Sequence, residues 1–296
     1  MRPFAERLRS GDVLVGDGAT GTMLLERVVE AGRAPEAATL SHPEVLADLA
    51  RLYVEAGAQI VETNTFGGSP LKLALSGLEG TVEEVNRMAV RAAREGAGDR
   101  AYVAASCGPC GKLLEPHGDT AQTAVYDSFR QQMTVLLAAG VDCVFVETMT
   151  DLDEATLAIR AAKDTAPDIP VAAMMTFDRT PRGFYTIMGV TVARAAAGLA
   201  EAGADAVGSN CGNGIEHMIE IAQEFRRHTD LPLIIQPNAG LPQAVGSSIV
   251  YDETPAFVAG KARELVDLGV TVIGGCCGTT PSHIRAIRTM VDEPRS

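Results

Sequence analysis

A helix-to-strand pattern recurs along this chain, and it restricts the fold more than any other feature does. It occurs at 55–64 (EAGAQIVETN), 138–148 (AAGVDCVFVET), 201–210 (EAGADAVGSN) and 267–276 (DLGVTVIGGC). In each copy a helical pattern reaches a glycine, as at a helix C-terminus. A short run follows that is apolar on both faces, as in a strand buried on both sides. The repeated unit predicts a parallel sheet covered by helices.

Four further runs have the same strand-like character and lie between these copies: Val13–Asp17, Tyr102–Ser106, Pro170–Thr176 and Leu233–Gln236. Eight βα units in 296 residues predict an α/β fold, a single (β/α)8 TIM barrel that occupies residues 1–296 as one domain. An open doubly wound sheet is the alternative. It is disfavoured because no G-x-G-x-x-G follows a strand.

Several helix starts carry capping signals. Ser41–Glu44 and Thr81–Glu84 have the spacing of capping boxes, in which the first side chain and the fourth cap each other's backbone amides. Thr280 and Pro281 are expected to open the last helix, with proline in its first turn.

Charge and composition exclude several functional classes. The chain carries a net charge of −13 and has no run of Lys or Arg, so we expect neither nucleic acid nor an anionic membrane surface as partner. It contains no run of about 18 apolar residues, the length of a membrane span. Its N-terminus lacks the apolar core of a signal peptide. The six cysteines are therefore interpreted as reduced thiols of a cytoplasmic protein.

Three cysteines fall at the strand ends where a barrel places its active site. Cys276 and Cys277 follow the eighth strand, and Cys211 follows the sixth. We expect Gly274, Gly275 and Gly278 to let both vicinal side chains reach one centre. Three thiolates favour zinc, and three protein ligands leave a fourth position open, as in catalytic sites. Packing cysteines and a vicinal disulfide are the alternatives.

Two carboxylates also end strands. Asp17 stands before GATGT, where a carboxylate and nearby backbone amides can hold the ammonium and carboxylate of an amino acid. Glu147 ends an apolar run, where an unpaired carboxylate would be costly unless it meets a cation. Simple turn chemistry for Asp17, and a structural ion pair for Glu147, are the alternatives.

Cys107-Gly-Pro-Cys110 has the form of a thioredoxin-type redox motif. A loop with a second proline follows it instead of a long helix, so we interpret it as a loop over the barrel mouth. Cys143 lies within a strand and is expected in the core. The five histidines show no nucleophile–base pattern, and no G-x-S-x-G occurs.

Seven motifs occur in order along almost the whole chain: DGATGTML (17–24), ETNTFGG (62–68), GPCGKLLEPHGD (108–119), VETMTDLDEA (146–155), SNCGNG (209–214), PNAGLP (237–242) and GGCCGTTPSHI (274–284). In these the chain resembles the zinc-dependent homocysteine S-methyltransferases, which are (β/α)8 barrels. Within that family, GKLLEPHGD and PNAGLP look most like the homocysteine-binding module of cobalamin-dependent methionine synthase.

The resemblance implies that Cys211, Cys276 and Cys277 bind Zn²⁺, and that homocysteine enters at the fourth position through its sulfur. Asp17 and Glu147 would then orient the substrate ammonium. The backbone amides of Gly18 and Ala19 would hold its carboxylate. Further rim contacts are expected from Asn64, Asn210 and Asn238.

The methyl donor is the open point. Methionine synthases continue into folate and corrinoid modules, whereas this sequence ends at Ser296, so we expect the methyl group from elsewhere, such as methylcobalamin on a separate corrinoid protein. One alternative is a small-molecule donor of the S-methylmethionine or betaine type. Others are a zinc-binding subunit of a corrinoid system that is inactive alone, and a dithiol oxidoreductase that uses Cys107 and Cys110.

Overall fold

The main sheet is an eight-stranded parallel barrel in a computed structural model that describes residues 1–29, 33–245 and 248–293. Its strands pair in the order in which they occur along the chain, apart from two hairpins that lie outside the barrel. The barrel strands are β1 (Leu14–Val15), β2 (Ile60–Glu62), β3 (Tyr102–Cys107), β4 (Cys143–Met149), β5 (Val171–Met175), β8 (Ala206–Asn210), β9 (Leu233–Gln236) and β12 (Val272–Ile273). Six of the eight lie within the predicted runs, and β3 and β4 each extend one residue beyond theirs, so the (β/α)8 fold is confirmed.

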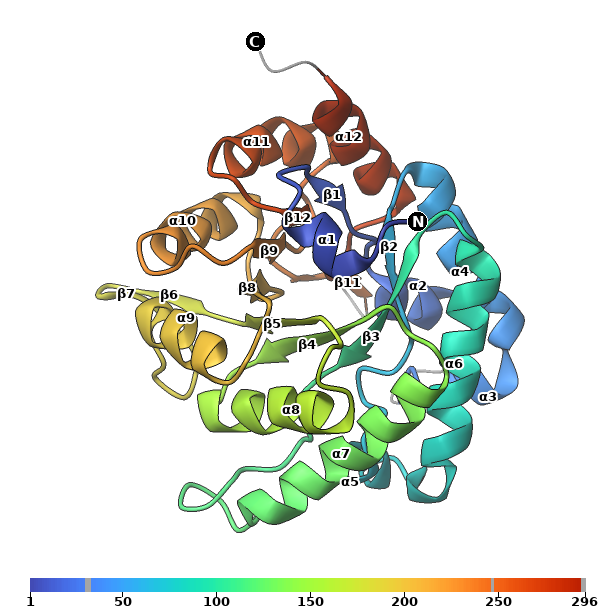
Figure 1. The fold of residues 1–296 in the computed structure, drawn as a ribbon. Coiled ribbons are helices and arrows are strands. Elements are labelled where there is room, and N and C mark those ends of the chain that lie inside the picture. The colour runs from blue at the N-terminus through green and yellow to red at the C-terminus, as the bar shows by residue number, and fades with distance from the viewer. Residues whose placement is uncertain (30–32, 246–247, 294–296) are drawn as a thin grey trace.

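Helices surround the barrel, as Figure 1 shows. They are α2 (Thr20–Arg27), α3 (Ala37–Ser41), α4 (Pro43–Ala56), α5 (Pro70–Ala74), α6 (Val82–Ala97), α7 (Gln122–Ala138), α8 (Leu152–Thr165), α9 (Val192–Glu201), α10 (Ile215–Arg226), α11 (Pro255–Asp267) and α12 (Pro281–Asp292), with a 3-10 turn at Glu79–Thr81. Within the described residues, none of these helices combines the length and the apolar character that a membrane crossing requires.

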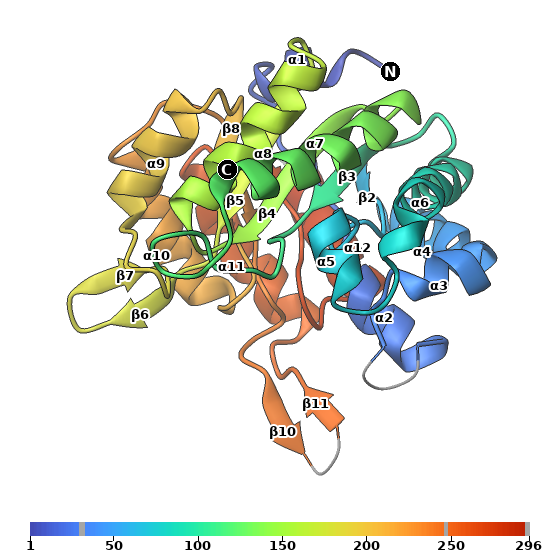
Figure 2. The ribbon, with the colours of Figure 1, turned by 90° about the horizontal axis from the view of Figure 1, so that it is seen from below.

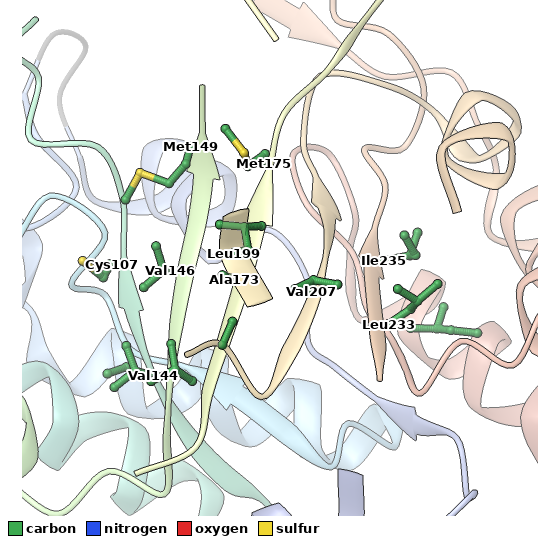
Figure 3. Close-up of a cluster of buried hydrophobic side chains, with 14 of the residues drawn as sticks. Cys107, Val144, Val146, Met149, Ala173, Met175, Leu199, Val207, Leu233 and Ile235 are labelled. Carbon is green, nitrogen blue, oxygen red and sulfur yellow. The ribbon is translucent and has the colours of Figure 1, made fainter. Parts of the chain in front are cut away.

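Between strands and helices lies the larger part of the core, drawn in part in Figure 3. Val146 of β4, Ala173 of β5 and Val207 of β8 point outward from the sheet toward residues such as Leu199 of α9. Each fully buried Val or Leu side chain contributes about 1.5–3 kcal/mol to stability. This layer fixes the strand register and therefore the position of every strand end.

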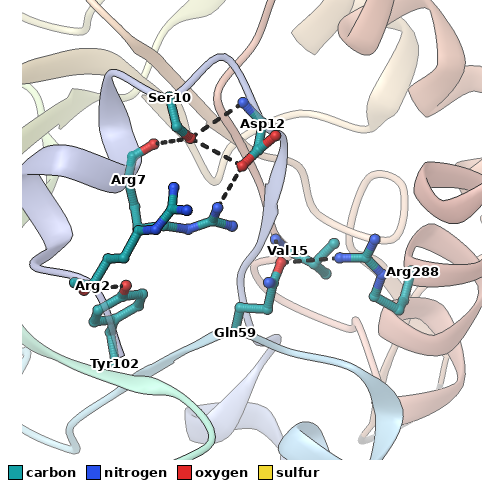
Figure 4. A network of polar contacts seen from close by, with 8 residues as sticks. All are labelled: Arg2, Arg7, Ser10, Asp12, Val15, Gln59, Tyr102 and Arg288. Atoms are coloured by element: carbon teal, nitrogen blue, oxygen red, sulfur yellow. Dashed lines mark hydrogen bonds and ion pairs between the residues drawn. The ribbon is translucent and has the colours of Figure 1, made fainter.

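A short N-terminal helix, α1 (Phe4–Leu8), closes one end of the barrel. Phe4 and Leu8 join the apolar residues of the barrel interior, among them Cys143, whose predicted core position is confirmed. The ring of Phe4 lies edge-to-face on Tyr102 at 5.2 Å, and the Tyr102 hydroxyl donates to the carbonyl of Arg2 at 2.6 Å (Figure 4). The cavity of the molecule must therefore open at the other end.

Side chains help to close the seam between the first and second strands, where no regular ladder forms. Gln59 N donates to Val15 O at 2.7 Å, and Val15 N donates back to Gln59 Oε1 at 3.3 Å. The same Oε1 accepts from Arg288 of α12 at 2.9 Å (Figure 4). Toward the other end of the seam, Glu62 N donates to Asp17 Oδ2 at 2.9 Å. Asp17 thus replaces a ladder hydrogen bond.

Two hairpins that the sequence analysis did not predict project from the C-terminal end of the strands. They are β6 (Asp178–Thr180) with β7 (Gly183–Tyr185), and β10 (Gln243–Val245) with β11 (Ser248–Val250). Figure 2 shows both on the side opposite α1. Their short, partly polar strands lack the apolar runs by which the barrel strands were identified.

Both predicted capping boxes, at Ser41–Glu44 and Thr81–Glu84, are wrong. Ser41 is the last residue of α3, and its hydroxyl donates to Ala37 O at 3.2 Å. The Thr81 hydroxyl donates to Leu78 O at 2.8 Å, so it accepts no hydrogen bond from α6. Both hydroxyls bond to carbonyls of a preceding turn, which competes with capping. The predicted start of α12 at Thr280 is confirmed, where His283 completes the box.

Candidate active site

A cavity of about 580 Å³ opens at the C-terminal end of the barrel strands. This volume is typical of small-molecule sites. Its wall includes residues from seven strand ends and the loops that follow them, among them Gly18, Glu62, Ser106, Glu147, Asn210, Gln236, Cys211, Cys276 and Cys277. A groove of about 610 Å³ between α11 and α12 is slightly larger. It lies on the outer surface and gathers no comparable set of reactive groups, so the barrel cavity is the candidate site.

Cys211, Cys276 and Cys277 come together on one wall of this cavity, as the sequence predicted. Their sulfur atoms all lie within 4.8 Å of one another, and the Sγ atoms of Cys211 and Cys277 are 3.8 Å apart. All six cysteines are free thiols, so no vicinal disulfide forms. Three sulfurs this close match the donor set of a zinc site.

The backbone around the three thiols is fixed by hydrogen bonds to the segment after β9. Cys211 N donates to Gln236 O at 3.1 Å, and Cys276 N donates to Pro237 O at 2.7 Å. Cys211 itself has φ of 60°, a left-handed conformation that non-glycine residues rarely adopt. Such strain is common where a functional side chain must be aimed.

The expected role of the glycines needs correction. Gly278 alone of the three has a positive φ, at 78°. Gly274 and Gly275 instead permit close packing: a Cβ on Gly275 would lie 2.3 Å from Thr279 Oγ1, and one on Gly274 would lie 3.0 Å from Gln236 Nε2. The vicinal pair is therefore positioned by tight packing before it and a left-handed turn after it.

The three sulfurs form an electrostatically coupled group. Hydrogen bonds from Cys211 and Cys276 lower the pKa of Cys277 to about 3, and the hydroxyl of Tyr251 adds to this effect. Hydrogen bonds to the other two thiols raise the pKa of Cys276 well above its usual range. The three thiols therefore act as one titrating group, and a cluster of thiol donors of this kind favours capture of a soft cation.

Two carboxyl groups line the same cavity, of which Glu147 is buried and Glu62 is partly buried. Glu147 accepts hydrogen bonds from the Ser106 hydroxyl and, at 2.9 Å, from Asn210 Nδ2. Glu62 accepts from Gln236 Nε2 at 2.7 Å. Burial is the main cause that raises the pKa of both groups, and for Glu147 the neighbouring Glu62 raises it further. Burial thus favours the protonated form of these carboxyl groups, whereas a cation beside them would favour their ionised form.

Asn210 connects the carboxyl groups to the thiols. It is fully buried, and its Nδ2 lies 2.9 Å from Glu147 Oε2 and 3.9 Å from Cys276 Sγ. Its Oδ1 accepts from the backbone N–H of Thr148 at 2.7 Å. Thr148 has φ of 57° and lies in a register shift of β4, which the Asn210 contact stabilises.

Asp17, Gly18 and Ala19 lie where the chain leaves the first strand. Gly18 and Ala19 line the cavity, but Ala19 N already donates to Thr279 O at 3.2 Å. Asp17 is buried and lies at the seam behind the cavity wall. Burial and then Glu62 raise its pKa. The first turn of α2 at Thr20–Thr22 also faces the cavity and presents its N-terminal end to it.

The other two predicted asparagines are placed differently. Asn64 lines the cavity, but its amide donates to Pro35 O at 2.8 Å and Thr39 Oγ1 at 3.0 Å, which ties the α3 region to β2. Asn238 is buried beside the backbone of the thiol segment, and its Oδ1 has no hydrogen-bond partner among the described residues.

Cys107 and Cys110 are separate from this site and fully buried. Cys107 Sγ lies 3.5 Å from Gln132 Oε1, and Cys110 N donates to Glu154 at 2.7 Å. Burial is the main cause that raises the pKa of both thiols, that of Cys110 to about 12. Redox-active thiols need a low pKa and access to solvent. The geometry therefore disfavours the dithiol oxidoreductase alternative.

The sequence analysis did not assign roles to Glu62, Gln236 and Tyr251. Glu62 and Gln236 each end an apolar strand with a polar side chain, the same signal that identified Glu147. Tyr251 follows the β10–β11 hairpin, and a Cβ on Gly278 would lie 2.2 Å from its Cγ. No local pattern predicted that this ring would reach the thiols.

Comparison with known proteins identifies the family of this chain. The family model described as homocysteine S-methyltransferase matches residues 14–291. The methionine synthases of Mycobacterium leprae and Mycobacterium tuberculosis are each 32% identical over 94% of this chain. The chain spans only 24% of the length of these two relatives.

Solved structures show the same fold. The metallated form of the homocysteine methyltransferase MmuM from Escherichia coli has a TM-score of 0.80 and 24% identity, over 97% of this chain and 99% of that one. The oxidised form of the same protein has a TM-score of 0.79 and 25% identity, over 98% and 99% of the two chains.

Proposed function

The chain belongs to the homocysteine S-methyltransferase family, and on that premise we propose that it methylates the sulfur of homocysteine to form methionine. The main support for this proposal is that one cavity contains two different sets of side chains. Three clustered thiols face a set of buried carboxyl groups, and Asn210 bridges the two. An amino acid with a side-chain thiol has the complementary charges and donors.

The three cysteines fit zinc. Their sulfurs lie within 4.8 Å of one another, are partly buried, and already share hydrogen bonds that a metal would replace. Cys211, Cys276 and Cys277 would hold the ion and leave its fourth position to the substrate. Zinc, when bound, lowers the pKa of a coordinated thiol, so that the substrate sulfur is a thiolate at neutral pH.

The protein's own groups orient the amino acid end. The Glu147 carboxylate would accept a hydrogen bond from the substrate ammonium. Asp17, which lies behind the cavity wall, would contribute negative charge nearby. Gly18, Ala19 and the first turn of α2 lie together on another part of the wall. Free amides at a helix N-terminus favour a carboxylate, so we place the substrate carboxylate there. Asn64 and Asn238 are assigned supporting roles at the rim.

The chemical step then requires little more than positioning. The thiolate of homocysteine attacks the methyl carbon of the donor in line. A sulfur–carbon bond forms, and the bond from methyl to donor breaks, with its electron pair remaining on the donor. Asn210 holds Glu147 and lies 3.9 Å from Cys276 Sγ, so it fixes the ammonium end relative to the reacting end.

We further propose methylcobalamin on a separate corrinoid protein as the donor. Large apolar side chains stand exposed in segments that follow five different strands and surround the cavity end: Leu25, Leu75, Leu113, Ile187, Leu241 and Ile249. Ile187 and Ile249 are 79% and 66% exposed. Ile249 lies in the β10–β11 hairpin, Leu241 precedes that hairpin and Ile187 follows the β6–β7 hairpin. Figure 2 shows both hairpins projecting on this side. Such apolar rims are typical of protein-docking surfaces.

The test is a donor panel. The purified protein is incubated with homocysteine and, in turn, methylcobalamin, a methylated corrinoid protein, S-methylmethionine and betaine, and methionine is quantified. We expect methionine from the cobalamin donors. Turnover only with a sulfonium or ammonium donor would replace the donor assignment. Tight zinc binding without transfer from any donor would instead indicate a subunit that is inactive alone.

A further inference from the structure

Gln236 holds a buried oxygen with no partner, beside the candidate amino acid site. Its side chain is 2% exposed and lines the cavity. Nε2 donates to Glu62 Oε1 at 2.7 Å, which aims the amide at the carboxyl groups. Among the described residues, Oε1 of Gln236 accepts no hydrogen bond. A buried acceptor without a donor is unfavourable, so this oxygen indicates a donor that is missing.

The groups around this oxygen are acceptors as well. The carboxyl groups of Glu62 and Glu147 lie within hydrogen-bonding reach of each other, and the pKa of each is raised mainly by burial. Neither carboxyl, nor that of Asp17, forms an ion pair with a lysine or arginine in the part of the chain that the structure describes. The subsite therefore lacks both a cation and enough hydrogen-bond donors.

An alkylammonium group supplies both a positive charge and hydrogen-bond donors. It carries one positive charge and three N–H donors, against the three acceptors that Glu62, Gln236 and Glu147 present. We propose that these three side chains form the ammonium subsite, and that substrate binding expels the proton that Glu62 and Glu147 share. The inference rests on the proposed function, and it adds Glu62 and Gln236 to the residues that recognise the substrate.

The proton balance of this step is simple. On this proposal, the Glu62–Glu147 pair of the free protein holds one proton and one negative charge. The amino acid arrives as an ammonium ion, the pair becomes doubly ionised against it, and one proton passes to the solvent. The other titratable groups that act on the pair are Asp17, with Tyr53 of α4 behind it, and the thiols of Cys107 and Cys143, which lie outside the cavity wall. These groups are anionic or neutral. Arg33, between α2 and α3, and Lys72 of α5 also line the cavity.

Calorimetry with methionine tests the inference. Methionine has the ammonium but no thiol, so a proton released on its binding must come from the protein. The metal-loaded protein is titrated in buffers of different ionisation enthalpy at pH 7. We expect close to one proton released per methionine bound. The hydroxy analogue, 4-(methylthio)-2-hydroxybutanoate, lacks the ammonium and should bind weakly with no release.

Two variants locate the effect. Glu62→Gln removes the shared proton and should abolish proton release. Gln236→Met removes the acceptor and should raise KM for homocysteine about tenfold with little change in kcat. This is the kinetic pattern expected when an interaction equally strong in the ground state and the transition state is lost. A purely structural role for Gln236 would lower stability and leave KM unchanged.

The outcomes separate the two proposals. If the wild-type protein methylates homocysteine but binds methionine without releasing a proton, the inference is wrong and the proposed function stands. If neither homocysteine nor methionine binds, the proposed function itself fails.

Discussion

The carboxylate of Asp17 accepts a hydrogen bond from the backbone N–H of Glu62 at 2.9 Å, across the seam where the barrel closes. The first two strands form no regular ladder there, and this contact stands where a ladder bond would be. Asp17 therefore connects barrel closure to the site, because the residue it holds is itself part of the cavity wall. Sequence reasoning had assigned Asp17 to the substrate alone.

Substitution of Asp17 should separate these two roles. Asp17→Ala removes a buried acceptor and should lower stability by about 1–3 kcal/mol. Asp17→Asn keeps an oxygen for Glu62 N–H and removes a charge from a buried acidic group, so its thermal midpoint should equal or exceed that of the wild type. KM for homocysteine should rise in both. An equal loss of stability in the two variants would contradict the seam role.

Loss of any one of the three cysteines should remove the metal site. Cys211→Ala, Cys276→Ala and Cys277→Ala should each lower zinc content to well below one per chain and abolish methyl transfer, because two sulfurs rarely retain zinc against competing ligands. Zinc is measured by atomic emission after dialysis. Cys143→Ala, in the barrel interior away from the cavity, is the matched control and should keep its zinc. Full occupancy in all three site variants would show that the metal site is misplaced.

Asn210 and Ser209 are neighbours on β8 and provide a matched pair. Asn210→Ala leaves Thr148 N and Glu147 without their partner, so we expect zinc affinity to fall about 10–100-fold, as for other residues that support metal ligands. Ser209 Oγ is buried and has no hydrogen-bond partner in the part of the chain that the structure describes. Ser209→Ala should therefore be neutral or slightly stabilising. Chelator competition measures the zinc affinity of both variants. Equal zinc affinities in Asn210→Ala and Ser209→Ala would argue against a positioning role for Asn210.

The sequence predicted the barrel well because its strands are buried on both faces. Such strands appear as continuous apolar runs, and a glycine before four of them marked the end of the preceding helix. The end of each run then identified the positions that face the cavity, which is why Cys211, Cys276 and Glu147 were found. The exposed hairpins β6–β7 and β10–β11 were missed because their strands bury little surface.

Side-chain partners could not be predicted in the same way. Strand position gives the place of a residue but not the direction of its hydrogen bonds. Asn64 lies at the rim as expected, yet its amide is committed to Pro35 and Thr39. The left-handed conformation of Cys211 depends on contacts with a different strand, and no local propensity encodes it.

The CGPC segment should be dispensable for methyl transfer. Cys107 and Cys110 are buried with raised pKa values, and neither lines the cavity. The double variant Cys107→Ser with Cys110→Ser should retain methyl transfer within about twofold and lose about 1–2 kcal/mol of stability, since two hydroxyls replace thiols in an apolar setting. Steady-state kinetics measure the methyl transfer of the double variant, and thermal melts measure its stability. A loss of turnover with unchanged stability would restore a chemical role.

Stability should depend on pH through Glu62. Burial raises its pKa in the folded protein above the value of 4.5 that it has when exposed. The folded state therefore binds more protons than the unfolded state above about pH 4.5, and stability falls as pH rises through that window. Glu62→Gln removes this pH-dependent contribution to stability. In metal-free protein the variant should exceed the wild type in thermal midpoint at pH 8 by a few degrees, and by less at pH 5, since about 1 kcal/mol shifts the midpoint by about 2–4 °C. Glu95→Gln, an exposed change on α6, should give no such difference. A wild-type advantage that grows with pH would show that Glu62 meets a cation already present in the free protein.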